Sequence, residues 1–166
     1  MKKIIFVDLD ETLIHTFMAN WGETPTKDAE EVILNTDGAT DIYNTVLRQG
    51  AIYFLEVLRK AGNVYMLTAA TTDYANAMNQ HFGLGFTEKE IYAREDTRAG
   101  VADPEFFGTG KVYLFDNLPR HDNRTKIDFL KPLGELKYVQ VQDFYNNKYG
   151  AFTHADIEGL VSNIVD

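Results

Sequence analysis

Two aspartates one residue apart, Asp8 and Asp10, directly follow the apolar run Ile4–Val7. A β-branched and aromatic run of this length predicts a strand buried on both faces, as in a parallel sheet. Side chains alternate along a strand, so both carboxylates leave its end on the same side. Two such charges need a shared proton or cation. Mg²⁺ is the hard ion that binds carboxylate oxygens and keeps waters for a phosphate, so this pair predicts a magnesium and phosphate site.

Polar residues also follow two later apolar runs. Thr68 comes after Val64–Leu67, and Asp116 and Asn117 come at the end of the run that starts at Val112. In open α/β sheets the carboxyl ends of neighbouring parallel strands lie along one edge, where ligands bind. We therefore expect these three residues to share one site with the first pair of aspartates.

The elements that must position these residues alternate between strands and helices. We expect strands at 4–7, 64–68, 90–93, 112–116 and 138–141, and helices at 51–61, from Thr71 or Thr72 to about 83, and from about 153 to 165. This alternation predicts an α/β fold, a Rossmann-like parallel sheet flanked by helices with right-handed crossovers.

Residues 14–47 read as an insertion after the first strand. Two β-type runs, 31–35 and 42–47, flank the turn signal Asp37-Gly38 and predict a β-hairpin. We expect this hairpin to form a small flap, with His15 as a flap-base or packing residue, and we expect no large cap domain. The whole chain, 1–166, is predicted to be a single domain.

Composition narrows the class of protein further. The chain has 166 residues, no cysteine and a net charge of −9. Without cysteine, disulfides and thiolate metal sites are excluded, and a cytoplasmic, intracellular location is expected. No window approaches the roughly 20 apolar residues of a membrane span, so we expect no membrane role. The acidic balance argues against a broad nucleic-acid surface.

The motifs resemble a known superfamily. Asp8-Leu9-Asp10-Glu11-Thr12 is similar to the first motif of the haloacid dehalogenase (HAD) superfamily of phosphotransferases, Thr68 to its second, and Phe115-Asp116-Asn117 to its fourth. A narrower likeness is to the phosphatases of the RNA polymerase II carboxy-terminal domain and their small relatives. It rests on the ordered series of Asp8–His15, Arg48-Gln49-Gly50, Leu67–Ala70, Tyr74-Ala75, Arg94-Glu95 and Asp116–Pro119. Gln49 and Leu118 depart from that pattern, which usually has proline and serine there.

The resemblance implies a mechanism. Asp8 attacks phosphorus and forms an aspartyl phosphate, while Asp10 acts as the general acid and then the general base. Thr68 binds phosphoryl oxygens. The implied substrate-binding positions are Leu9, Thr12, which mainly braces the loop, and Ala69. The implied cofactor is Mg²⁺, with the ligands Asp8, Asp10 through its backbone carbonyl, Asp116 and Asn117.

The superfamily also requires a lysine or arginine before the fourth strand. Lys111 lies in the strand that ends at Asp116, and at about 3.3 Å per residue it falls roughly 16 Å away. We predict that Arg98 supplies the cation, with Arg94 as the alternative. Residues beyond 120 carry nothing that can be assigned to chemistry.

The expected function is a Mg²⁺-dependent phosphomonoester hydrolase. A small flap leaves an open site, which suits a phosphorylated macromolecule such as a phosphoserine or phosphothreonine protein segment. A nucleotide or polynucleotide 3′-phosphatase is the alternative. A phosphate-binding module without efficient turnover is a second alternative, which the absence of a third-motif cation near Asp8 would favour.

Overall fold

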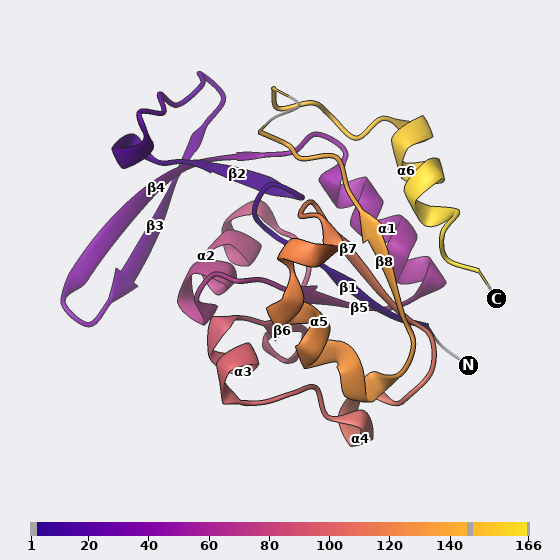
Figure 1. Cartoon of the computed structure of the whole chain (residues 1–166). Helices are drawn as coiled ribbons and strands as arrows, with labels where there is room; N and C mark the ends of the chain where they lie inside the picture. Colours follow the sequence, from indigo (N-terminus) through magenta and orange to yellow (C-terminus); the bar gives the residue numbers. More distant parts are fainter. Residues whose placement is uncertain (1–2, 146–147, 166) are drawn as a thin grey trace.

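Five parallel strands form the central sheet of the computed structural model, which describes residues 3–145 and 148–165 (Figure 1). The strand order is β6-β5-β1-β7-β8, and every neighbouring pair is parallel. The strands are β1 (Lys3–Val7), β5 (Gly62–Leu67), β6 (Ile91–Tyr92), β7 (Val112–Asp116) and β8 (Leu136–Gln140). The predicted parallel α/β sheet is confirmed.

The sheet is buried on both faces because successive apolar side chains of a strand point to opposite faces of the sheet. On β1, Ile5 and Val7 join one core cluster, whereas Ile4 and Phe6 join a second cluster. Helices α1 (Ala51–Ala61), α2 (Thr72–Phe82) and α6 (His154–Val161) contribute to the first cluster, and α4 (Pro104–Phe107) and α5 (Arg124–Leu130) contribute to the second. Asp8 and Asp10 therefore follow directly after a strand that is packed on both faces.

The insertion after β1 forms a second, antiparallel sheet in the order β2-β4-β3. Its strands are β2 (Ile14–Phe17), β3 (Glu30–Thr36) and β4 (Ala39–Leu47). The hairpin of β3 and β4 extends away from the central sheet in Figure 1. The predicted hairpin flap is confirmed, and the described residues contain no large cap. The strand β2, which carries His15, was not predicted because it is only four residues long.

Several short helical segments of the second half also escaped prediction. They are η2 (Glu88–Glu90), α3 (Arg94–Ala99), α4, η3 (Arg120–Asp122), α5 and η4 (Lys131–Leu133). Each of these segments alone has three to seven residues and is too short to display a helical hydrophobic period. In the part of the chain that the structure describes, no helix has both the length and the apolar character needed to cross a bilayer.

Arg48 joins the loop after β1 to the C-terminal segment. Its guanidinium is buried and donates hydrogen bonds to the carbonyl oxygens of Thr12 at 3.3 Å, Gln142 at 2.7 Å and Gly150 at 2.9 Å. The guanidinium carbon also lies 3.9 Å from the ring centroid of Phe152. Since each bond has a charged donor, this single side chain fixes three backbone segments relative to one another.

Gly50 provides the first stability prediction, because it adopts φ +89° and a Cβ at this position would lie 2.3 Å from the Phe152 carbonyl oxygen. We expect Gly50→Ala to lower the free energy of unfolding by about 2–5 kcal/mol, through left-handed strain plus overpacking against backbone. Gly83 has φ +62° but open space around it, so the control Gly83→Ala should cost only about 1–2 kcal/mol. Urea unfolding of both variants measures the difference, and equal losses would contradict a close approach at Gly50.

Candidate active site

The ends of β1, β5 and β7 meet at one edge of the sheet. Parallel pairing continues one residue past β1 and β5, since the Asp8 N–H donates to the Phe115 carbonyl at 2.9 Å and the Thr68 N–H donates to the Tyr92 carbonyl at 2.9 Å. Asp116 is the last residue of β7. The structure therefore brings Asp8, Thr68 and Asp116 to the common edge that their strand-end positions predict.

The cation at this edge is Lys126, not the predicted Arg98. The Lys126 ammonium nitrogen lies 2.7 Å from Asp8 Oδ1 and 2.7 Å from Asp116 Oδ2, and all three side chains are buried. Arg98 lies on α3 with an exposed side chain. Arg94, the alternative, donates from Nε to the Ala69 carbonyl at 2.9 Å, so it braces the loop after β5. Lys126 reaches Asp8 and Asp116 because the buried face of α5 packs on the sheet beside β1 and β7.

The sequence does hold a signal for Lys126. Along α5 and the turn that follows, Lys126, Leu130 and Leu133 fall at i, i+4 and i+7 and are all buried. A lysine on the apolar stripe of a helix requires a buried counter-charge. The prediction missed this residue because a cation was sought only before the fourth strand.

Burial dominates the electrostatics of the two first-motif aspartates. It raises the pKa of Asp8 to about 7, against the attraction of Lys126 and with added repulsion from Asp116. Burial also raises the pKa of Asp10 to about 6, while a hydrogen bond from Tyr74 opposes the rise. Burial disfavours the charge on Lys126, but Asp8 and Asp116 outweigh this effect and raise its pKa. The site thus gathers more negative charge than its one ammonium group balances.

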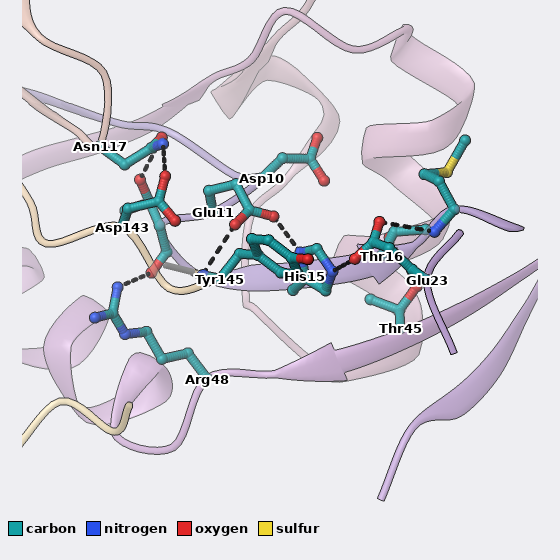
Figure 2. Close-up of polar contacts among 12 residues, drawn as sticks. Asp10, Glu11, His15, Thr16, Glu23, Thr45, Arg48, Asn117, Asp143 and Tyr145 are labelled. Carbon is teal, nitrogen blue, oxygen red and sulfur yellow. Dashed lines mark hydrogen bonds and ion pairs between the residues drawn. The ribbon is translucent and has the colours of Figure 1, made fainter. Parts of the chain in front are cut away.

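The oxygens that could hold Mg²⁺ lie beside Asp8. The Thr12 hydroxyl lies 3.0 Å from Asp8 Oδ2 and 3.4 Å from Asn117 Oδ1. The Asn117 amide nitrogen donates to Asp143 at 3.1 Å, as Figure 2 shows. This bond turns the amide oxygen toward Thr12 and Asp8.

Asp116 has other partners. One of its oxygens accepts from Lys126 and the other accepts from the Leu118 N–H at 3.0 Å. No three Asp, Glu or His side chains among the described residues form a ready metal cage. The donor set that the resemblance implies, which is Asp8, Asp116, Asn117 and the Asp10 carbonyl, consists of the oxygens that Mg²⁺ binds while it retains water.

Donors for phosphoryl oxygens surround the same point. The Leu9 side chain is fully buried, so only its backbone can reach a ligand. Within the described structure, the N–H groups of Leu9 and Asp10 have no acceptor. Thr68 Oγ1 accepts from the Ala70 N–H at 3.1 Å, which leaves the hydroxyl proton for a ligand. Ala69 lies in the loop between them with its side chain exposed. These groups form a cradle of donors next to Asp8.

A groove of about 490 Å³ opens over Asp10. It lies between the flap and the loops after β1 and β5, and its lining residues include Met18, Trp21, Tyr43, Tyr74 and Arg94. Trp21 is 74% exposed, so an aromatic face is available to a ligand at its rim. The groove is open, and one side of it is formed by the flap.

His15 fastens the base of the flap. Its two ring nitrogens face carboxylates of Glu11 and Glu23, the latter at 2.7 Å, and its ring stacks on Tyr145 with centroids 4.8 Å apart (Figure 2). Both nitrogens must donate, so the ring is an imidazolium. Burial opposes this charge, but the hydrogen bonds and charges of the two glutamates outweigh it and raise the pKa of His15. The placement agrees with the expected flap-base role.

Comparison with protein families identifies the chain. The family model described as NLI interacting factor-like phosphatase matches residues 3–102. The chain belongs to this family. Membership confirms the predicted resemblance to HAD phosphatases. A comparison with curated proteins gave no match.

Two solved structures of an RNA polymerase II CTD phosphatase, Fcp1, have a similar fold. One is fission yeast Fcp1 in a variant bound to beryllium fluoride, and the other is described as Fcp1, an essential RNA polymerase II CTD phosphatase. Each is 19% identical with a TM-score of 0.54 over 97% of this chain, which covers 50% and 48% of those chains respectively. At this identity the similarity concerns the fold, and our chain spans about half of each Fcp1 structure.

The family match and the site overlap only in part. Asp8, Asp10 and Thr68 lie within the matched residues, whereas Asp116, Asn117 and Lys126 lie beyond residue 102. This member of the NLI interacting factor-like phosphatase family thus completes its charged centre from a part of the chain that the family model does not match.

From the buried ion pair we expect Lys126→Met to destabilise the protein much more than Arg98→Met. Lys126→Met leaves two buried carboxylates without a counter-charge, so we expect the free energy of unfolding to fall by about 3–5 kcal/mol. Arg98→Met removes an exposed side chain and should change it by no more than about 0.5 kcal/mol. Urea unfolding near neutral pH compares the two, and an unchanged Lys126→Met would show that the buried pair does not form.

The raised pKa of His15 should make the stability of the protein depend on pH. Because its folded-state pKa is raised, its stabilisation is complete below the unfolded value near 6.5 and is lost as pH rises through the folded value. The gap in unfolding free energy between wild type and His15→Asn should therefore be about 1–3 kcal/mol smaller at pH 9 than at pH 6. The exposed pair of His121 with Asp122 makes His121→Asn a control with little effect at either pH. A gap for His15→Asn that does not change with pH would contradict the imidazolium.

Proposed function

We propose that this protein is a Mg²⁺-dependent phosphomonoester hydrolase that works through an aspartyl-phosphate intermediate. The observation that carries the proposal is the buried contact of Lys126 with Asp8, beside Asp10 and a cradle of N–H and hydroxyl donors. A nucleophilic carboxylate in contact with an ammonium group can approach an anionic phosphoryl group, because the cation offsets part of the repulsion.

The residues have distinct roles in two steps. A carboxylate oxygen of Asp8 forms a bond to phosphorus as the bond to the leaving oxygen breaks, and Asp10 gives that oxygen its proton. Asp10 then takes a proton from a water molecule, whose oxygen attacks phosphorus and releases phosphate and the Asp8 carboxylate. Throughout, Lys126, Thr68 and the amides of Leu9 and Asp10 stabilise the charge on the phosphoryl oxygens.

Asp8, the Asp10 carbonyl, Asp116 and Asn117 would hold Mg²⁺. When bound, the ion neutralises charge between the Asp8 carboxylate and the phosphoryl oxygens. Asp116 orients Lys126, and Asp143 holds the Asn117 amide oxygen in place. In this assignment Thr12 keeps the bracing role that the sequence suggested.

The groove over Asp10 favours a phosphoserine or phosphothreonine protein segment as substrate. The leaving group must depart on the side of Asp10, which is where the groove opens. A volume of about 490 Å³ with Met18, Trp21 and Tyr43 along it accommodates several residues of an extended chain. A small metabolite would be left largely exposed to solvent in it.

A second candidate is a polynucleotide 3′-phosphatase. A separate surface hollow of about 700 Å³ runs along η3 and α5 and is lined by Arg120, His121, Arg124 and Lys131, together with Ile127 and Asp128. The hollow lies on the solvent-facing side of α5, the helix whose buried side carries Lys126, in a chain whose net charge is −9. A nucleic-acid backbone is the polyanion that such a local basic face fits.

Phosphate release with and without Mg²⁺ tests the proposal. The panel is an aryl phosphate, phosphoserine and phosphothreonine peptides, nucleoside monophosphates and a 3′-phosphorylated oligonucleotide. We expect Mg²⁺-dependent release that chelation abolishes, since the approach of two anions needs the cation. Asp8→Asn should lose activity, and Lys126→Met should lower it at least about 100-fold, whereas Arg98→Met should match wild type.

The panel also separates the alternatives. The best substrate distinguishes a phosphoprotein from a nucleic-acid enzyme. No release from any substrate would reject the hydrolase proposal and favour a phosphate-binding module. Full activity in Lys126→Met would reject the role given to that lysine.

A further inference from the structure

A line of three hydroxyl groups runs from the flap to Asp10. The Tyr74 hydroxyl lies 2.8 Å from Asp10 Oδ1 and 2.6 Å from Thr16 Oγ1. Thr16 Oγ1 in turn lies 2.9 Å from Thr45 Oγ1, and Figure 2 shows these two threonines close together. Tyr74 comes from α2, Thr16 from β2 and Thr45 from β4, so the line joins the helix and two flap strands to the loop after β1.

Chemistry fixes the direction of these hydrogen bonds. An ionised Asp10 carboxylate can only accept hydrogen bonds. Tyr74 must therefore donate its single hydroxyl proton to Asp10 Oδ1. Thr16 must then donate to the Tyr74 oxygen, and Thr45 must donate to Thr16. All three donors therefore point toward Asp10. Chains of this kind polarise one another, so each bond strengthens the next.

The line runs from Tyr74, which lines the groove, into the buried base of the flap. Thr45 is fully buried and Thr16 is 8% exposed. The Tyr43 ring packs edge-on against Tyr74 with centroids 5.1 Å apart, which holds the phenol in place.

We propose that Tyr74, backed by Thr16 and Thr45, is a positioning residue that fixes the Asp10 carboxylate and keeps its transferable proton on Oδ2. In this arrangement Tyr74 keeps donating to Oδ1 after Asp10 takes up its proton, so the proton that Asp10 gives to the leaving oxygen resides on the other oxygen. In the described part of the chain Oδ2 accepts no hydrogen bond, so it remains available to the substrate. This inference rests on the proposed hydrolase function and adds a residue from outside the loop after β1.

The flap has a chemical role in this arrangement. Thr16 and Thr45 pair directly across β2 and β4, and the same flap forms one side of the groove over Asp10. A shift of β2 relative to α2 would break the bond of Thr16 with Tyr74. The position of the flap therefore bears on the orientation of the general acid as well as on substrate contact.

Leaving-group dependence tests the role of Tyr74. General acid catalysis matters for an alkyl leaving group and little for a 4-nitrophenolate, and kcat/KM reports the step in which that group departs. We expect Tyr74→Phe to lower kcat/KM about 10- to 100-fold on a phosphoserine peptide, which is part of the range of general acid catalysis. On 4-nitrophenyl phosphate the loss should stay below about threefold.

Matched variants isolate the hydroxyl line. Thr45→Val should show a weaker loss of the same kind and Thr45→Ser should restore activity, because only the latter keeps the donor. Tyr53→Phe, at an exposed position on α1, controls for loss of a phenol elsewhere. Thermal unfolding of each variant checks that the fold is retained.

The outcomes separate the two proposals. An equal loss on both substrates, or no loss on either, would overturn the positioning role while leaving the hydrolase function in place. Absence of phosphate release by wild type would overturn the hydrolase function and this inference with it. A crystal structure of Tyr74→Phe with Asp10 in an unchanged orientation would overturn the inference independently of activity.

Discussion

The buried contact of one ammonium group with two carboxylates constrains the rest of this structure. Removing Asp8, Asp116 and Lys126 from water costs several kcal/mol per ion, and only close contacts recover that cost. Both contacts are 2.7 Å, and they require α5 to lie across the ends of β1 and β7. The segment from η3 to η4 and the strand β8 after it serve this placement, since the apolar side chains of α5 close the second core cluster around the charged group.

A second set of hydrogen bonds, centred on Glu11, holds the loop after β1 from the opposite side. Glu11 has φ +67°, a conformation that costs a residue with a side chain about 1–2 kcal/mol. Its backbone carbonyl accepts from the Phe144 N–H at 2.8 Å, and its carboxylate accepts from the Tyr145 N–H at 3.0 Å. His15 binds the same carboxylate. Together with Arg48, these bonds compensate the strain, so the C-terminal segment and the flap jointly hold Asp10 where the site needs it.

The features that follow from hydrophobic periodicity and from residues at strand ends could be predicted from the sequence. The runs before Asp8, Thr68 and Asp116 are continuous and apolar, which is the pattern of a sheet covered on both faces, and their order was enough to place the polar residues at one edge. The hairpin followed from its turn signal. Prediction failed where spacing along the chain carries no information about space. Arg98 precedes the fourth strand, as the superfamily pattern requires, yet its side chain on α3 is exposed. Lys126 follows Asp116 in the chain and still reaches Asp8, because α5 doubles back along the sheet.

The source of the cation shows what the chemistry of such a site demands. Asp8 must extend from the end of β1, because only that backbone position gives the carboxylate its direction and leaves adjacent N–H groups as donors. A cation has no such restriction. Its long side chain can approach from any element that packs beside β1 and β7, and the field at Asp8 depends on distance and burial rather than on chain order. The nucleophile must follow β1 in the sequence, whereas the balancing charge can come from any part of the chain that places it beside Asp8.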